Sequence, residues 1–170
     1  QSVLSSGGLF ADPVQLAVVP GTWVTAATTI ANVAPSLALG AVAAVSEGGT
    51  ATLSGTIADP GTQDTFTVVV DWGDGTAPAT FNYPAGTTTF SQTHPYLDDD
   101  ADDQYTISVT VTDDDSGADT KTTTVTVTNV APTIALSGAE TVNEGATHTL
   151  TLGTVTDPGT DTVAQWIVHW

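Results

Sequence analysis

The stretch FTVVVDWGDG at residues 66–75 constrains the fold of this chain more than any other. At period two, the residues of one face are Phe66, Val68, Val70 and Trp72. This alternation is typical of a strand with one buried face. The Gly-Asp-Gly that follows predicts a tight turn, because glycine adopts positive φ at no steric cost. The sequence therefore predicts a core strand that ends in a buried tryptophan just before the chain reverses.

The same alternation recurs further along the chain. Between Tyr105 and Thr112, aromatic and branched aliphatic residues alternate with serine and threonine, and Val125 and Val127 lie between threonines. Threonine on one face and valine on the other is typical of a half-buried strand in an antiparallel sheet. No helical periodicity of useful length is present. The patterns predict an all-β fold with two packed sheets of about seven strands.

The neighbours of the tryptophan stretch extend the motif in a fixed order. Asp59-Pro60-Gly61 precedes the stretch, His94-Pro95-Tyr96 follows it, and an alternating segment runs from Tyr105 to Asp113. Together with Asp71–Gly75, these segments resemble the PKD (polycystic-kidney-disease-type) repeat. The resemblance implies tandem immunoglobulin-like antiparallel β-sandwiches of the kind found in extracellular proteins. His94-Pro95-Tyr96 is a permuted form of the third family element, and Asp103 stands where a glycine often sits.

An internal repeat divides the chain. Three motifs recur in the same order: Asn32–Pro35 as 129–132, Glu47-Gly48 as 144–145, and Asp59–Thr62 as 157–160. Repetition of this kind is the signature of a repeat array. We expect the end of a preceding β domain or an N-terminal strand segment at 1–33, a complete sandwich at 34–130, and a truncated second repeat at 131–170.

Two of these regions carry finer expectations. In the first, strands are predicted at Leu16–Val19 and Trp23–Ile30, around a turn at Pro20-Gly21. The last region should supply three strands of a sandwich, with an apolar face left open around Leu150, Leu152 and Ile167. One hypothesis is that a neighbouring chain covers this face, which would give a head-to-tail homopolymer.

The charge of the chain limits its partners. The formal net charge is −18, with one Lys or Arg against 19 Asp and Glu. Such a chain repels nucleic acid and anionic membrane surfaces, so we expect neither nucleic-acid binding nor membrane insertion. Without cysteine, it has no disulfide, zinc–thiolate site or cysteine nucleophile. These features and the resemblance predict an extracellular or cell-surface location.

The sequence contains little that would support catalysis. The three histidines are His94, His148 and His169, and none lies in a recognised nucleophile or zinc motif. His94 falls in the part of the motif where the family has a structural residue. The acids gather in turn-like clusters rather than on strand ends that face a cleft. We therefore predict that this chain is not an enzyme.

Clustered aspartates are the best candidates for a binding site. Simple solvation of acidic loops would account for them. The alternative is calcium, which takes six to eight hard oxygen ligands. In an immunoglobulin-like sandwich, loops alternate between two poles, and the family resemblance implies calcium at the pole near the linker in some members. The predicted Ca²⁺ ligands of this linker pole are Asn32, Asp59, Asp64, Asp113, Asp114 and Asp115.

The opposite pole, here called the far pole, should hold Glu47, Asp74 and a second acidic cluster. The members of that cluster are Asp98, Asp99, Asp100, Asp102 and Asp103. Asp74 is expected to form an Asx-type turn. Tyr105 resembles the tyrosine corner of such sandwiches, with its hydroxyl bonded to nearby backbone. Trp23 and Tyr83 are the only aromatic candidates for a sugar-binding face.

Two functions remain open at the level of sequence. The first is a structural or adhesive repeat module of a large extracellular protein, such as a filament or surface-layer component, stiffened by calcium and in contact with neighbouring repeats. The alternative is an accessory binding module of a secreted enzyme that degrades polysaccharide or protein. The linkers Asn32–Pro35 and 129–132 suit the first function, because proline restricts the backbone where repeats meet.

Overall fold

The computed structural model describes residues 13–19, 22–27 and 29–169, and over these ranges the chain is all-β. The described part of the chain contains no helix, and so none that is long and apolar enough to cross a membrane. The chain divides into two compact units, Gln1–Val33 and Ala34–Trp170. The first boundary expected from the sequence falls at this division.

The N-terminal unit contains a pair of antiparallel strands, β1 (Pro13–Val19) and β2 (Thr22–Ala27). Both strands were predicted, although β2 ends at Ala27 rather than at Ile30. The predicted turn at Pro20-Gly21 lies outside the described residues.

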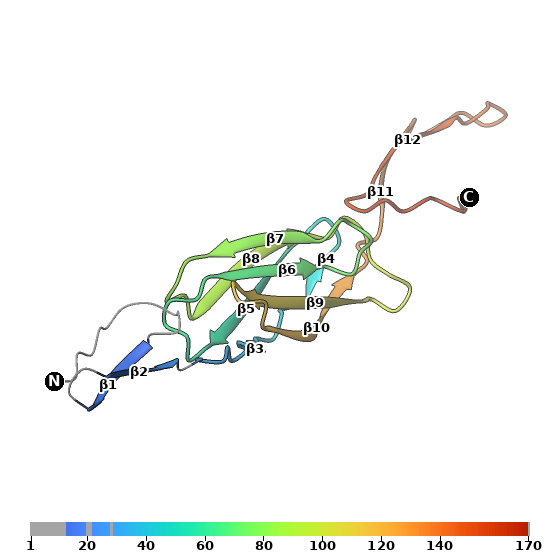
Figure 1. The fold of residues 1–170 in the computed structure, drawn as a ribbon. Coiled ribbons are helices and arrows are strands. Elements are labelled where there is room, and N and C mark those ends of the chain that lie inside the picture. Colours follow the sequence, from blue (N-terminus) through green and yellow to red (C-terminus); the bar gives the residue numbers. More distant parts are fainter. Residues whose placement is uncertain (1–12, 20–21, 28, 170) are drawn as a thin grey trace. The chain divides into compact units, whose positions relative to one another are not determined.

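Two sheets make up the region from 34 to 130 (Figure 1). The smaller sheet has the order β3 (Ser36–Leu39), β5 (Thr50–Ala58), β8 (Thr89–Pro95). The larger sheet has the order β4 (Val45–Ser46), β10 (Ala118–Thr128), β9 (Gln104–Asp113), β6 (Phe66–Asp71), β7 (Ala79–Tyr83). All neighbours pair antiparallel except β4, which runs parallel to β10. This region is called the sandwich below.

The core lies between the two sheets and follows from the alternation in the sequence. Every second residue of β5 is buried, including Leu53 and Ile57, and these side chains pack in one cluster with Val68 and Val109 of the larger sheet. Full burial of such a side chain contributes about 1.5–3 kcal/mol. Trp72 belongs to the same cluster with 2% of its surface exposed, which confirms its predicted burial.

Asx-type hydrogen bonds shape the turn after β6. Asp71 Oδ1 accepts a hydrogen bond from the Gly73 amide at 3.0 Å, and Asp74 Oδ1 accepts one from the Thr76 amide at 3.1 Å. Gly73 has a φ of 81°, and a Cβ atom there would clash with the Thr106 carbonyl, so this position requires glycine. The predicted role of Asp74 as a turn residue is confirmed.

The segment 131–170, called the C-terminal segment below, contains β11 (Thr133–Gly138) and β12 (Leu150–Thr156), which pair antiparallel. Ile134 lies opposite Val155, just as Leu37 lies opposite Ile57 in the sandwich. The third strand expected near Ile167 is not formed, and that prediction was wrong.

The position of β6 in the sandwich explains the missing strand. β6 lies between β9 and β7, whereas within the described part of the C-terminal segment only β11 and β12 are strands. Residues 163–168 therefore have no partner strand there with which to form a ladder. Several large apolar side chains of the segment are exposed: Leu136, Val142, Leu152, Val163, Trp166, Ile167 and Val168.

Candidate metal centre

Three aspartates of the predicted linker pole converge in the structure. Asp59 follows β5, Asp64 precedes β6, and Asp113 ends β9. The pairing of Phe66 with Asp113 places the end of β9 beside the start of β6, which brings two of the three acids together. One carboxylate oxygen from each aspartate lies within 4.8 Å of the others. The geometry suits oxygen coordination of a single cation.

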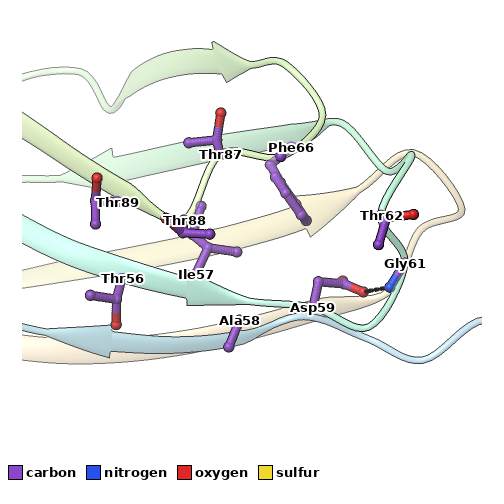
Figure 2. A pocket seen from close by; sticks show the side chains of 11 residues that line it. Thr56, Ile57, Ala58, Asp59, Gly61, Thr62, Phe66, Thr87, Thr88 and Thr89 are labelled. Atoms are coloured by element: carbon purple, nitrogen blue, oxygen red, sulfur yellow. Dashed lines mark hydrogen bonds between the residues drawn. The ribbon is translucent and has the colours of Figure 1, made fainter.

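Asp64 lies deepest in this group. Only 2% of the residue is exposed, and its Oδ1 atom has no hydrogen-bond partner among the described residues. Asp59 Oδ1 accepts a hydrogen bond from the Gly61 amide at 2.7 Å (Figure 2), while its buried Oδ2 atom also lacks a partner in the described structure. Burial of an uncompensated carboxylate costs several kcal/mol, because the charge loses its hydration. A bound cation would remove that cost.

The electrostatics of the group favour a positively charged ligand. Burial raises the pKa of Asp64, and repulsion from Asp59, Asp114 and Asp113 raises it further. The only basic residue of the chain, Lys121, instead pairs with Asp119 at 2.7 Å. A divalent cation between the carboxylates would relieve the same repulsion that raises the pKa of Asp64.

The other predicted ligands of the linker pole have different places. Asp114 Oδ1 accepts a hydrogen bond from the Thr65 amide at 3.0 Å, so this side chain fastens the start of β6. Asp115 is exposed and acts on Asp64 through its charge. Asn32 belongs to the N-terminal unit.

The acids of the run at the far pole have different surroundings. Asp98 and Asp99 lie beside the buried Glu47. Asp100 Oδ1 accepts a hydrogen bond from the Ala101 amide at 2.8 Å, whereas Asp102 and Asp103 are exposed. A turn from Asp100 to Asp103 is closed by a backbone hydrogen bond of 2.7 Å. Burial raises the pKa of Asp99, and the neighbouring Asp161 and Asp103 raise it further, so the two ends of the run remain in electrostatic contact.

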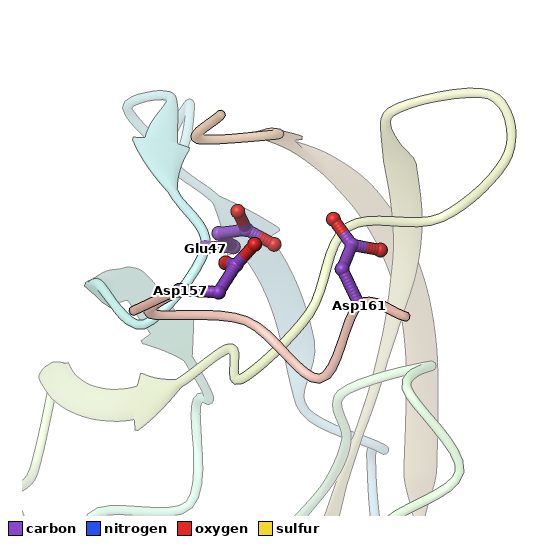
Figure 3. A group of neighbouring side chains, drawn as sticks. All are labelled: Glu47, Asp157 and Asp161. Carbon is purple, nitrogen blue, oxygen red and sulfur yellow. The ribbon is translucent and has the colours of Figure 1, made fainter. Parts of the chain in front are cut away.

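Three acids were missed as site residues by sequence reasoning: Glu47, Asp157 and Asp161. They form a further group with carboxylate oxygens within 4.8 Å of one another (Figure 3). The internal repeat contained the signal for two of them, because the Asp-Pro-Gly-Thr motif at residue 157 repeats the motif at residue 59. The burial of Glu47 could not be predicted from the sequence, because the Glu-Gly pair, although it recurs at 144–145, is typical of an exposed turn.

His94 is held among structural residues, in keeping with its place in the motif. Its ring stacks on Trp72 with ring centroids 4.8 Å apart. It is nearly perpendicular to the ring of Tyr96, with ring centroids 5.0 Å apart. Its Nε2 atom lies 2.7 Å from Asp74 Oδ2. Burial raises the pKa of Asp74, but hydrogen bonds with His94 and Thr76 outweigh burial, and the net effect is a lowered pKa.

A groove of about 600 Å³ lies next to the linker pole (Figure 2). Threonines 87–89 line one side, and the aromatic residue in its lining, Phe66, is 4% exposed. Tyr83 packs against the core and accepts a hydrogen bond from Gln92 at 2.8 Å, while the side chain of Trp23 lies outside the described structure. The groove therefore offers no exposed aromatic face for a sugar ring, and it does not favour the accessory-module alternative.

The chain matches no protein-family model and no curated protein.

Proposed function

We propose that this chain is a structural module of a large extracellular or cell-surface protein, built from PKD-like immunoglobulin sandwiches in tandem and stiffened by calcium. The observation that carries the proposal is the convergence of Asp59, Asp64 and Asp113, with Asp64 buried and one of its oxygens lacking a partner among the described residues. A purely solvated acidic loop would instead keep its carboxylates in water.

The tandem arrangement draws support from the repeated strand pairing. Leu37 lies opposite Ile57 and Ile134 lies opposite Val155, at corresponding points of the internal repeat. The Asn-Val-Ala-Pro linker before the second of these pairs is held in place, because the amide of Val130 donates a hydrogen bond of 2.6 Å to Glu47 Oε1. Proline in the linker further limits the backbone. Short, fastened linkers suit a spacer that must resist bending.

Calcium is the cation that best fits this chemistry. It accepts six to eight oxygen ligands in irregular geometry, whereas magnesium requires near-ideal octahedral coordination and gives up its water reluctantly. Extracellular modules bind calcium with Kd of about 10⁻⁴–10⁻³ M. In this proposal, external calcium occupies the linker pole, neutralises part of the charge of −18 and holds the loops that meet there.

Thermal denaturation tests this proposal. Calcium at tenfold excess over its Kd should stabilise the folded chain by about 1.4 kcal/mol for one site. Sodium chloride at equal ionic strength screens repulsion without coordination, so its smaller effect is the baseline. The Asp64→Asn substitution should remove the part of the calcium-specific gain that the linker pole supplies, and Asp102→Asn, at an exposed acid of the far pole, should leave the gain unchanged. Equal responses to calcium and to matched sodium chloride would refute the calcium part of the proposal.

A further inference from the structure

Glu47 is a buried acid whose role is not explained by the sandwich core. Only 3% of the residue is exposed. Its Oε1 atom accepts the hydrogen bond from Val130, while its Oε2 atom is buried and has no hydrogen-bond partner in the part of the chain that the structure describes. Backbone bonds fix its position, because the Glu47 amide bonds to the Thr128 carbonyl at 3.0 Å and the Gly48 amide to the Tyr96 carbonyl at 2.7 Å. The charge is thus held in place where water does not reach it.

Acids from two parts of the chain surround this carboxylate. Asp157 and Asp161, from the loop after β12, each place a carboxylate oxygen within 4.8 Å of one of Glu47, and Figure 3 shows the three side chains as neighbours. Asp98 and Asp99 approach it from the sandwich, again with oxygens within 4.8 Å. Asp98 Oδ1 is also buried without a hydrogen-bond partner among the described residues. Glu47 therefore belongs to two groups of three carboxylates, one with Asp157 and Asp161 and one with Asp98 and Asp99. The chain's single Lys or Arg pairs instead with Asp119.

The loop from Asp157 to Asp161 is shaped around Glu47. A Cβ atom at Gly159 would clash with the Glu47 carboxylate, so only glycine allows this approach. The Gly159 amide donates a hydrogen bond of 3.0 Å to Asp157 Oδ1, and the Asn129 side chain donates one of 2.9 Å to Asp161 Oδ2. The Thr160 hydroxyl donates to Asp98 Oδ2. These contacts hold like charges together, which is unfavourable without a counter-ion.

We propose that a divalent cation, calcium by its preference for several carboxylates, binds where the two groups meet at Glu47 and joins the C-terminal segment to the sandwich. Its other ligands would be Asp157 and Asp161 of the C-terminal segment and Asp98, whose Oδ1 lies beside Gly159 together with the Glu47 carboxylate. This inference deepens the proposed function, because it gives calcium a second site that spans two repeats. The internal repeat relates Asp157 and Asp161 to Asp59 and Asp64 of the linker pole. Glu47 and Asp98 are the additional ligands, and they come from the neighbouring repeat.

Calcium titration of the full chain by calorimetry, in excess sodium chloride, tests the number of sites. We expect two calcium ions per chain, and one ion in Glu47→Gln, because glutamine keeps the acceptor for Val130 but removes the charge. Asp161→Asn serves as a second variant, with calcium binding at this site weakened by about tenfold or more, since affinity follows ligand charge. Asp102→Asn is the control with the same change in net charge at an exposed position.

A distance measurement tests the mechanical consequence. The chain has no cysteine, so Thr122→Cys on β10 and Ser137→Cys on β11, both exposed, allow specific spin labelling. Calcium chloride should narrow the distribution of distances between the labels, and this narrowing should persist with Asp64→Asn but disappear with Glu47→Gln. Narrowing that survives Glu47→Gln, or wild-type stoichiometry in both Glu47→Gln and Asp161→Asn, would overturn the inference. If only Asp64→Asn lost calcium binding, the proposed site at Glu47 would be refuted, and the proposed site at the linker pole would stand.

Discussion

The hydroxyl of Tyr96 donates a hydrogen bond of 2.9 Å to the backbone carbonyl of Trp72, and both residues are buried. The bond joins the end of β8 in the smaller sheet to the end of β6 in the larger one. Burial raises the pKa of Tyr96, so its phenol is a neutral donor at neutral pH. This contact links the two sheets next to the turn that defines the sequence motif.

Tyr96→Phe should destabilise the protein by about 1–3 kcal/mol, because the Trp72 carbonyl would be left buried without its donor. Urea denaturation of the wild type and the variant measures the difference. Tyr83→Phe is the matched control, since the Tyr83 hydroxyl bonds to Gln92 at a partly buried position and its loss should cost less. A larger cost for Tyr83→Phe than for Tyr96→Phe would contradict this assignment.

Trp72→Ala should lower the free energy of unfolding by about 3–5 kcal/mol, the range for large-to-small substitutions in a core. The wild-type fragment 34–130 should fold alone, because it contains both sheets and the core between them. Circular dichroism and denaturation of the fragment with and without the substitution check both points. A helical spectrum for the fragment, or an unchanged midpoint for Trp72→Ala, would contradict the account.

Asp74→Asn should destabilise the protein by about 1–2 kcal/mol near neutral pH, because it weakens the bonds to His94 and Thr76. The pKa of Asp74 is lowered in the folded state, so its stabilising effect is complete above the unfolded pKa of about 3.9 and is lost as pH falls through the folded pKa. The difference in free energy of unfolding between wild type and variant should therefore shrink below about pH 4. Urea denaturation at pH 7 and at pH 3 measures this difference. A difference that is larger at pH 3 would show that the ionised form of Asp74 does not stabilise the fold.

Much of the fold could be predicted from local patterns. The alternation from Phe66 to Trp72 and from Tyr105 to Val111 was enough to predict the strands, since each strand buries one face against the other sheet. Tyr105 was expected to bond to nearby backbone, and its hydroxyl donates to the Asp98 carbonyl at 3.2 Å. Such features depend on period and on neighbours close in sequence.

The contacts of the acidic residues depend on neighbours that are distant in sequence. The sequence therefore predicted these contacts less completely than it predicted the strands. Loop topology brought Asp59, Asp64 and Asp113 into one expected region, and the structure brings them together. The contacts of Glu47 are distant in sequence, because its carboxylate accepts a hydrogen bond from Val130, 83 residues away, and lies against Gly159. Asp98 and Asp102 belong to the same acidic run, yet Asp98 lies beside Glu47, whereas Asp102 lies within the turn from Asp100 to Asp103 and is exposed.

A crystal structure of the chain grown with calcium chloride tests the central claim most directly. Anomalous scattering distinguishes calcium from water and sodium at the same position. The account predicts an anomalous peak between Asp59, Asp64 and Asp113, with ligand distances of about 2.3–2.6 Å to the carboxylate oxygens. A map at millimolar calcium in which only water lies between these three carboxylates would contradict it.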